Sequence, residues 1–436
     1  MKNRRWAWVA GAFLAMASCD MFSSDAVGSF VDAAGGDFDY LIGGEFQLVD
    51  GREQPYLARL DAAGELDGSF AAVLNGPVYD LTTIAWAGET QVLIGGAFST
   101  VNGESRPGVA LLGLDGSLDS GFAPDLGPAI TALGDRAIYA VLPVPERGTV
   151  LVGGIFDGAL AEEGLSVESL YANLVELNLG TGRAVPEFDP APDAAVYDIA
   201  PSVSSAAEWR VVVGGEFFFI GGQPAPFAAE VNGDGDTVIT IPEPTTIGIN
   251  AGERISYILS GFDDNEFDML VVGNSADLFG GYSVSGIYSG VGVAGSPGVF
   301  YHQGFELTRM DGYVNVISQT PNGRILYGGE FTVFDEFPSG GAVSAPYLAA
   351  YDEFGLDTEF PVTVDGPVYD AFVTPGPATI VAGAFATSSS SGSEGPGYLF
   401  RIDGDLQIDN GFSPELSRTD GGAVAVRVVR PIPGYD

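Results

Sequence analysis

One short phrase recurs along this chain and constrains its fold more than any other feature. The phrase is an apolar, β-branched run that ends in a glycine pair followed by an aromatic residue, first met at residues 41–46. Counted at the second glycine, or at the residue in its place, seven copies stand at positions 44, 96, 154, 215, 274, 329 and 383, which are 52 to 61 residues apart. A supersecondary unit repeated at such a spacing is typical of solenoids and propellers.

Each copy of the phrase is accompanied by further strand signals. An alternating apolar stretch follows it, as at residues 56–60, and then comes a turn rich in Asp and Gly with a short strand, as at 61–70. Another apolar strand precedes the phrase, as at 76–81. Glycine permits a positive φ and Asp bonds its own backbone, which favours hairpin turns. Four strands per repeat without an amphipathic helix pattern predict an all-β propeller.

The two ends of the chain predict how the ring would close. Candidate innermost strands lie near Val78, Ile138, Val196, Ile255, Val314, Val368 and Val424. The first phrase, at Tyr40, has no such strand before it, whereas the chain ends with a spare one at 423–430. Because open strand edges invite aggregation, we expect 423–430 to pair with the blade begun by 39–70. The sequence thus predicts a seven-bladed β-propeller over residues 30–436.

The repeat resembles a known family. The glycine pair with its aromatic residue, a following Asn102-Gly103, and then Ala-x-Leu and Asp-Gly-x-Leu-Asp are similar to the delta-60 repeat of β-propeller-like proteins in the bacterial envelope. The resemblance extends roughly over residues 40–420, is best at 40–70 and 91–122, and is poorest at 268–312. It implies a propeller on a secreted or surface protein and brings no enzymatic chemistry with it.

The N-terminal segment has the features of an export signal. Three of the first five residues are basic, and the next twelve are uncharged and mostly apolar, which predicts a signal peptide over 1–18. Small residues precede Cys19, the only cysteine, and resemble the lipobox of bacterial lipoproteins. We therefore expect a lipidated Cys19, a tether over 19–29, and a lipid anchor in the cell envelope, at the periplasmic face, the outer membrane or the cell surface. An ordinary signal peptide with a chance cysteine is the alternative.

Charge and composition narrow the function. The chain has 17 Lys and Arg against 58 Asp and Glu, a formal net charge of −41, which repels nucleic acid. One His and one Cys leave little for the commonest nucleophilic, acid–base or soft-metal chemistry. We expect a non-enzymatic module that binds a protein or glycan in the envelope and contacts the membrane through its lipid. The alternatives are a hydrolase or lyase that uses carboxylates alone, and a purely structural envelope component.

Three acidic residues stand at matching positions of predicted innermost strands, namely Asp80, Asp198 and Asp370. Alternation along a strand can direct such carboxylates into the central channel, where they would bind a hard cation such as Ca²⁺. In the alternative interpretation, each Asp caps the backbone of a neighbouring blade. The stretch 232–236 also contains calcium-loop residue types, but its position favours a hairpin turn. No other cofactor is expected.

Two further sequence patterns, the glycine pairs and a glycine-rich stretch, predict strand packing and a recognition surface. The glycine pairs end strands, so we expect them to permit a bulge or a close approach of a neighbouring strand, with the recurring Phe packed between blades. A glycine-rich stretch over 279–304 carries the aromatic residues Tyr282, Tyr288, Phe300 and Tyr301. Loops often carry recognition, so these four predict a contact patch; a flexible insertion without a partner is the alternative.

Overall fold

The computed structural model describes residues 38–433 apart from 127–135, 160–170, 202–208, 226–227, 241–253, 264–265, 277–282, 293–299, 302–306, 311, 321, 323, 338–341, 353–354, 375–377 and 392. Its regular structure is β-strand, arranged in small antiparallel sheets, with one 3₁₀ turn, η2, at Pro145–Arg147. Among the described residues, no helix has the length and apolarity that a membrane span requires. The all-β expectation is confirmed for this part of the chain.

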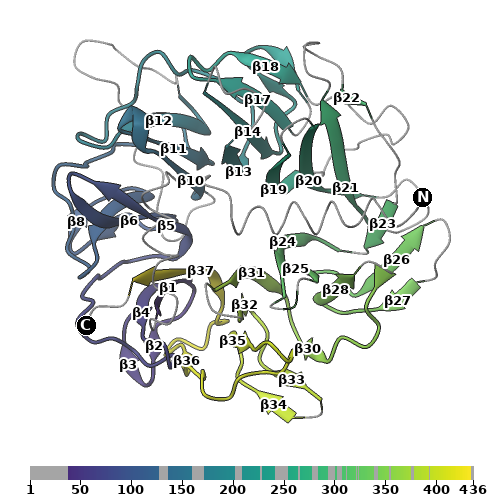
Figure 1. Cartoon of the computed structure of the whole chain (residues 1–436). Coiled ribbons are helices and arrows are strands. Elements are labelled where there is room, and N and C mark those ends of the chain that lie inside the picture. The colour runs from purple at the N-terminus through teal and green to yellow at the C-terminus, as the bar shows by residue number, and fades with distance from the viewer. Residues whose placement is uncertain are drawn as a thin grey trace.

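Seven sheets follow one strand pattern (Figure 1). Their first strands are β37 (Val426–Pro433), β5 (Val78–Trp86), β10 (Ile138–Val144), β13 (Val196–Pro201), β19 (Arg254–Asp263), β24 (Val314–Gln319) and β31 (Val368–Val373). Their second strands are β1 (Phe38–Gly44), β6 (Glu89–Gly96), β11 (Thr149–Gly154), β14 (Arg210–Gly215), β20 (Glu266–Ala276), β25 (Ile325–Gly329) and β32 (Thr379–Gly383). Their third strands are β4 (Leu57–Leu60), β9 (Val109–Gly113), β12 (Leu174–Asn178), β17 (Ala228–Asn232), β21 (Ser283–Gly292), β28 (Leu348–Asp352) and β35 (Leu399–Ile402).

The fourth strand of each repeat varies in length. Three sheets add β18 (Thr237–Thr240), β22 (Phe300–Tyr301) or β29 (Gly355–Leu356). In the other four, one isolated bridge stands in this place: Leu60 to Leu66, Leu112 to Leu118, Leu177 to Ala184, or Ile402 to Ile408. The turn before it is shaped by an Asx side chain, as where Asp61 Oδ1 accepts the N–H groups of Ala63 and Glu65. The predicted hairpin-turn chemistry is therefore present.

Short hairpins and connecting strands lie outside the seven sheets. The hairpin strands are β2 (Leu48–Val49), β3 (Arg52–Glu53), β7 (Thr100–Val101), β8 (Glu104–Ser105), β15 (Phe219–Ile220), β16 (Gln223–Pro224), β26 (Val333–Phe337), β27 (Ala342–Ser344), β33 (Ser388–Ser390) and β34 (Ser393–Gly395). Three hairpins pair with a strand from the end of the preceding repeat, namely β23 (Leu307–Met310), β30 (Val362–Val364) or β36 (Leu416–Ser417).

The sheets pack face to face with their neighbours. Because a second strand is central in its sheet and covered on both faces, it is mostly apolar, and all six residues of β11 are buried. Each large apolar cluster among the described residues combines two neighbouring sheets, as where Leu41 of β1 packs with Val78 and Val92 of the next sheet. The Phe that follows the glycine phrase packs between sheets, as predicted, at Phe46, Phe98, Phe156, Phe217 and Phe385. Phe331 is also buried.

The first strands contact one another in chain order. Strand β5 contacts β10, β10 contacts β13, and the series continues through β19, β24 and β31. Strand β31 then contacts β37, and β37 contacts β5. Figure 1 shows these seven strands around the middle of the molecule.

The C-terminal strand pairs with the N-terminal sheet. Strand β37 runs antiparallel to β1, with Phe38 opposite Pro433 and Ile42 opposite Val429. This is the pairing predicted for residues 423–430, with the strand itself placed at 426–433. The two ends of the chain are joined at a second place, since β36 pairs with β2 through Leu48 and Ser417. We call these two pairings the joints between the chain ends.

Two details differ from the sequence-based expectation. In the fifth repeat, Gly273 lies opposite Ile255 as the second glycine does elsewhere, so Asn274 was one residue out of place. The stretch 279–304, expected to be a recognition loop, contains strands β21 and β22. Extra strand length here is hard to see in sequence because Gly and Ser dilute the apolar alternation.

Candidate binding site at the strand bulges

A β-bulge lies at the same place in each of the seven sheets, opposite a glycine pair in five of them and opposite Val272-Gly273 or Ala382-Gly383 in the other two. In the β5–β6 pair, Val78 lies opposite Gly96 and Asp80 opposite Gly95, so Tyr79 is the extra residue. A Cβ on Gly96 would lie 2.1 Å from the backbone oxygen of Pro77. The N–H of Ala97 then donates to that same oxygen at 2.9 Å. The second glycine is needed because the backbone of the bulge occupies the space of a side chain.

The first glycine has a different task. A Cβ on Gly95 would lie 2.9 Å from side-chain carbons of Ile138 and Val141, which belong to the next sheet. Gly43 and Gly153 are similarly close to Val78 and Val196. This glycine therefore allows neighbouring sheets to pack closely. Both tasks predicted for the glycine pairs, a bulge and a close approach, are confirmed.

The bulged residue is a tyrosine in four of the seven sheets. They are Tyr79, Tyr139, Tyr197, Ser256, Asn315, Tyr369 and Arg427. A bulge turns its extra residue away from the regular alternation of the strand. The four tyrosines and Arg427 are partly exposed; we call these five residues the tyrosine collar.

The side chains of the tyrosine collar contact one another across five consecutive sheets. The rings of Tyr79 and Tyr139 stack with centroids 5.7 Å apart, and those of Tyr139 and Tyr197 lie 5.1 Å apart at a tilt. The guanidinium carbon of Arg427 lies 3.9 Å from the ring centroid of Tyr369 and 5.9 Å from that of Tyr79. The collar is thus a continuous aromatic surface that already holds one cation by cation–π contact.

Glutamate side chains add negative charge at the collar. Glu45 follows its glycine pair and accepts hydrogen bonds from Arg427 at 2.9 and 3.2 Å. Burial, with a further contribution from Glu45, raises the pKa of Tyr79 to about 12. Burial also raises the pKa of Tyr369, with smaller contributions from Glu330 and Glu45. Both phenols are therefore neutral hydrogen-bonding groups at physiological pH.

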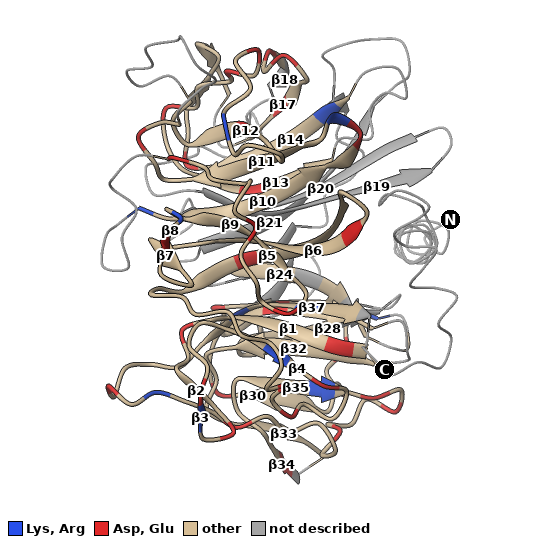
Figure 2. Ribbon diagram, turned by 90° about the vertical axis from the view of Figure 1, so that its left-hand side faces the viewer, with Lys and Arg blue, Asp and Glu red and all other residues tan. Residues whose placement is uncertain are grey.

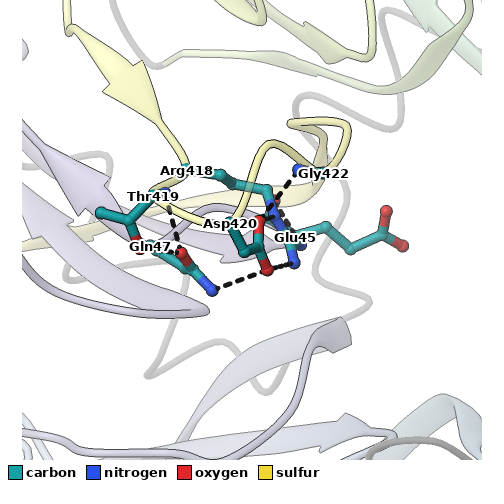
Figure 3. A network of polar contacts seen from close by, with 6 residues as sticks. All are labelled: Glu45, Gln47, Arg418, Thr419, Asp420 and Gly422. Carbon is teal, nitrogen blue, oxygen red and sulfur yellow. Dashed lines mark hydrogen bonds and ion pairs between the residues drawn. The ribbon is translucent and has the colours of Figure 1, made fainter.

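A network of hydrogen bonds from the C-terminal segment holds the backbone of Glu45 (Figure 3). The Arg418 guanidinium donates to the backbone oxygen of Glu45 at 3.3 Å and to the carboxylate of Asp420. The hydrogen bond from Arg418 holds the pKa of Asp420 below its ordinary value. Gln47 accepts from the backbone N–H of Thr419 at 2.9 Å and donates to Asp420. The C-terminal segment thus positions the acidic partner of Arg427.

Two of the three aspartates predicted as calcium ligands, Asp80 and Asp370, link neighbouring sheets. Asp80 Oδ2 accepts the N–H of Val141 at 2.8 Å, and Asp370 Oδ2 accepts that of Val429 at 2.8 Å. Asp370 also pairs with Arg430 at 2.5 Å, while Arg430 lies 4.0 Å from Asp80. The contacts of Asp80 and Asp370 fit the alternative stated above, in which each Asp caps the backbone of a neighbouring blade. Asp198 accepts the N–H of Ile199 at 2.8 Å.

No metal-binding group emerges from the part of the chain that the structure describes, since no three His, Cys, Asp or Glu side chains there gather closely enough to hold an ion. Asp80 is nevertheless unusual. Burial raises its pKa from 3.8 to about 6, although Arg430 and the Val141 N–H act in the opposite direction.

The stretch 232–236 forms the expected turn, with Asn232 Oδ1 accepting the N–H groups of Asp234 and Asp236.

The predicted contact patch is not a loop cluster. Tyr288 lies in β21, and Phe300 and Tyr301 form β22. Tyr282, Cys19 and the single histidine lie outside the described residues. The tyrosine collar was missed by the sequence analysis, although its signal was present: a tyrosine follows the first apolar residue of the first strand at 79, 139, 197 and 369.

Comparison with known proteins supports the repeat fold. A family model described as "Domain of unknown function (DUF5122) beta-propeller" matches residues 40–70 and 91–122. The two matched segments are thus similar to β-propeller repeats. The two matched segments hold the glycine pairs of β1 and β6, which shape the bulges at Arg427 and Tyr79. No curated protein matches the chain. The match leaves the narrower delta-60 resemblance a prediction, and the family description assigns no activity.

Proposed function

We propose that this chain is a closed seven-bladed β-propeller that acts as a non-enzymatic binding module for a protein or glycan in the cell envelope. Closure is supported by the order of contacts among the first strands, which returns to its start at β37 and β5. It is also supported by the two joints, β37 with β1 and β36 with β2. The delta-60 type of repeat belongs to the same proposal.

The tyrosine collar is the observation that carries the binding function. Four tyrosines and an arginine, each at the bulged position of its sheet, form one partly exposed surface. Tyr and Arg are enriched in binding surfaces because they offer large contact area together with hydrogen bonds. A purely structural spacer has no need of a shared aromatic position in neighbouring sheets.

Binding can be tested with a glycan array and a peptide array probed with purified protein. We expect at least one class of ligand to bind, and the double variant Tyr139→Ala, Tyr197→Ala to lose it. Val73→Ala is the matched control, because Val73 is 59% exposed and is not part of the collar. Absence of binding on both arrays, or equal binding by the wild type and the collar variant, would overturn the proposal.

The envelope location rests on the N-terminal sequence. Lipidation of Cys19 would hold the propeller at a membrane in spite of its net charge of −41, which anionic lipids repel. We expect mass spectrometry of the membrane fraction to find acylated Cys19, and Cys19→Ala to move the protein into the soluble fraction. A Cys19→Ala protein that stays with the membrane would count against this anchor.

A carboxylate-based hydrolase or lyase is the second candidate, because Asp80 has a raised pKa and lies with Asp370 around Arg430. Hydrogen bonds to the backbone of neighbouring strands occupy both carboxylates, which favours a structural role. Release of reducing ends or unsaturated products from polysaccharides, abolished by Asp80→Asn, would favour the enzyme.

A further inference from the structure

We propose that an exposed apolar surface on the β15–β16 hairpin docks a cationic polypeptide segment that also carries apolar side chains. The surface consists of Phe218, Phe219 and Pro224, and we call it the phenylalanine patch. Phe218 is 45% exposed and Phe219 is 49% exposed; among the described residues, the only other large apolar side chain so exposed is Val73. The patch lies outside the tyrosine collar, so it adds a second surface to the proposed function and does not depend on the ligand of the collar.

The fold itself does not require aromatic residues at this place. In the equivalent β7–β8 hairpin Thr100 lies opposite Ser105, whereas in β15–β16 Phe219 lies opposite Pro224. Opposite side chains of an antiparallel pair lie on the same face, so Phe219 and Pro224 form one apolar surface. Because the β7–β8 hairpin forms with two hydroxyl residues at these positions, the aromatic residues have no evident role in forming the hairpin.

Hydrogen bonds hold the backbone of the patch in place. Asp193 Oδ1 accepts the N–H of Phe218 at 2.8 Å and that of Phe219 at 3.0 Å. The N–H of Gly221, in the turn of the hairpin, donates to the backbone oxygen of Pro190 at 2.5 Å. The phenylalanines are thus presented by a fixed hairpin, which lowers the entropic cost of binding.

Exposed carboxylates lie on the segments that hold the hairpin. Asp193 bonds the backbone of the patch directly. Asp189 precedes Pro190, which accepts from the hairpin turn, and Asp236 precedes Thr237, whose Oγ1 donates to the backbone oxygen of the hairpin at 3.1 Å. All three aspartates are exposed. No Lys or Arg occurs in residues 187–195, 216–225 or 234–237, so the patch has an acidic border.

This chemistry favours a cationic polypeptide over other occupants. An apolar centre with a charged rim is the usual form of a protein interface, and a basic partner complements an acidic rim. Acidic residues are also spread over the described ribbon, with few basic ones among them (Figure 2). A second copy of the chain would bring like charges together, and the net charge of −41 repels anionic lipid. Phenylalanine lacks the polar group with which Tyr or Trp bonds a sugar hydroxyl.

Blocked heptapeptides that alternate two residue types test this inference. A Leu–Lys peptide has both features of the proposed ligand, a Gly–Lys peptide lacks the apolar side chains, and a Leu–Glu peptide has the wrong charge. Isothermal titration calorimetry with the full-length protein at physiological salt measures their affinities. The Leu–Lys peptide should bind about tenfold or more tightly than the Gly–Lys peptide, which reports charge attraction alone, and the Leu–Glu peptide should not bind.

Variants locate the site. The double variant Phe218→Ser, Phe219→Ser keeps the net charge and should bind the Leu–Lys peptide no more tightly than the Gly–Lys peptide. Val73→Ser is the matched control, because Val73 is an exposed apolar side chain of another repeat. Unchanged urea midpoints show that both variants are folded. Equal affinity of the wild type and the double variant for the Leu–Lys peptide, or an equal loss in Val73→Ser, would overturn the inference.

A charge variant tests the acidic border without changing the apolar surface. Asp236→Asn should weaken binding of the Leu–Lys peptide about twofold or more. Glu104→Gln is its control, since it removes the same charge from an exposed position in β8, at the outer edge of the molecule in Figure 1. Equal binding by these two variants would show only a general charge attraction and would count against the proposed site.

The remaining occupants are outcomes of the same comparison. Binding to phosphatidylcholine vesicles, a glycan-array signal or self-association that the Phe218→Ser, Phe219→Ser variant loses, without a preference for the Leu–Lys peptide, would assign the patch to lipid, glycan or a second copy and overturn the inference. The collar variant Tyr139→Ala, Tyr197→Ala should bind the Leu–Lys peptide as the wild type does, even if the collar has no ligand. Loss of that binding in the collar variant would place the peptide at the collar and overturn the inference for the patch.

Discussion

At the scale of single residues, the two glycines of each pair differ in what a side chain would meet. A Cβ on Gly96 would meet the backbone oxygen of Pro77 at 2.1 Å, whereas one on Gly95 would meet side-chain carbons of the next sheet at 2.9 Å. Side chains can change rotamer, but a backbone held in a strand pair can move only by breaking its hydrogen bonds. The same sequence pair therefore encodes two separate constraints.

Alanine substitutions should reveal this difference. We expect Gly96→Ala to lower the free energy of unfolding by about 3 kcal/mol or more, and Gly95→Ala by about 1–2 kcal/mol. Gly68→Ala is the control, because its Cβ would meet nothing closer than 3.7 Å. Urea unfolding followed by circular dichroism measures all three. A Gly96→Ala protein as stable as Gly68→Ala would contradict the bulge assignment.

Asp80 predicts a pH dependence of stability. Its pKa in the folded protein is raised from 3.8 to about 6, so between these values the folded state binds more protons than the unfolded state. Stability therefore rises as pH falls through about 6. Relative to Asp80→Asn, the wild type should gain on the order of 1–2 kcal/mol between pH 7 and pH 4, measured by urea unfolding at each pH. Parallel pH profiles for the two proteins would contradict this.

At the scale of elements, strand β37 has two structural roles. It covers the edge of β1 along its length and contributes Val426, Val429 and Ile432 to the buried core. It also carries Arg427, which pairs with Glu45 just after β1, and Arg430, which pairs with Asp370 of β31. The C-terminal strand thus joins core packing, edge protection and the tyrosine collar.

Truncation tests the role of β37. A chain ending at Ala425 should aggregate or unfold, because β1 would be left with a bare edge and its buried partners would be exposed. A chain ending at Pro433 keeps the whole strand and serves as the control. Size-exclusion chromatography and the urea midpoint are the measurements. A monomeric Ala425 truncation with an unchanged midpoint would show that β37 is dispensable.

The sequence predicted most of the strand order but not the collar. The glycine phrase, the Asp turns and the spare strand at 423–430 are local signals, and each has a local cause. The bulge depends on pairing between strands, so simple alternation assigned Asp80 to the channel and overlooked Tyr79. The pairing register also moved the fifth repeat from Asn274 to Gly273, because either residue ends the apolar run equally well.

At the scale of the whole molecule, the joint between the chain ends resembles the joints between internal repeats. Strand β37 lies beside β1 as β5 lies beside β6, each with one bulged residue. Strand β36 pairs with β2 just as β30 pairs with β33. In a closed ring of equivalent blades, the place where the chain begins and ends is one of several equivalent choices.

Circular permutation tests that equivalence. Phe38 lies opposite Pro433, so a linker of about four residues can join them as a hairpin. New ends between Ala87 and Gly88, in the exposed turn of β5 and β6, would make β5 the last strand and β6 the first. We expect this permutant to match the circular dichroism spectrum and urea midpoint of a linear 38–433 chain, whereas ends placed inside β6, between Leu93 and Ile94, should prevent folding. If the linear chain folds and the Ala87–Gly88 permutant does not, the terminal joint differs from the internal ones, and the closed seven-bladed propeller is wrong.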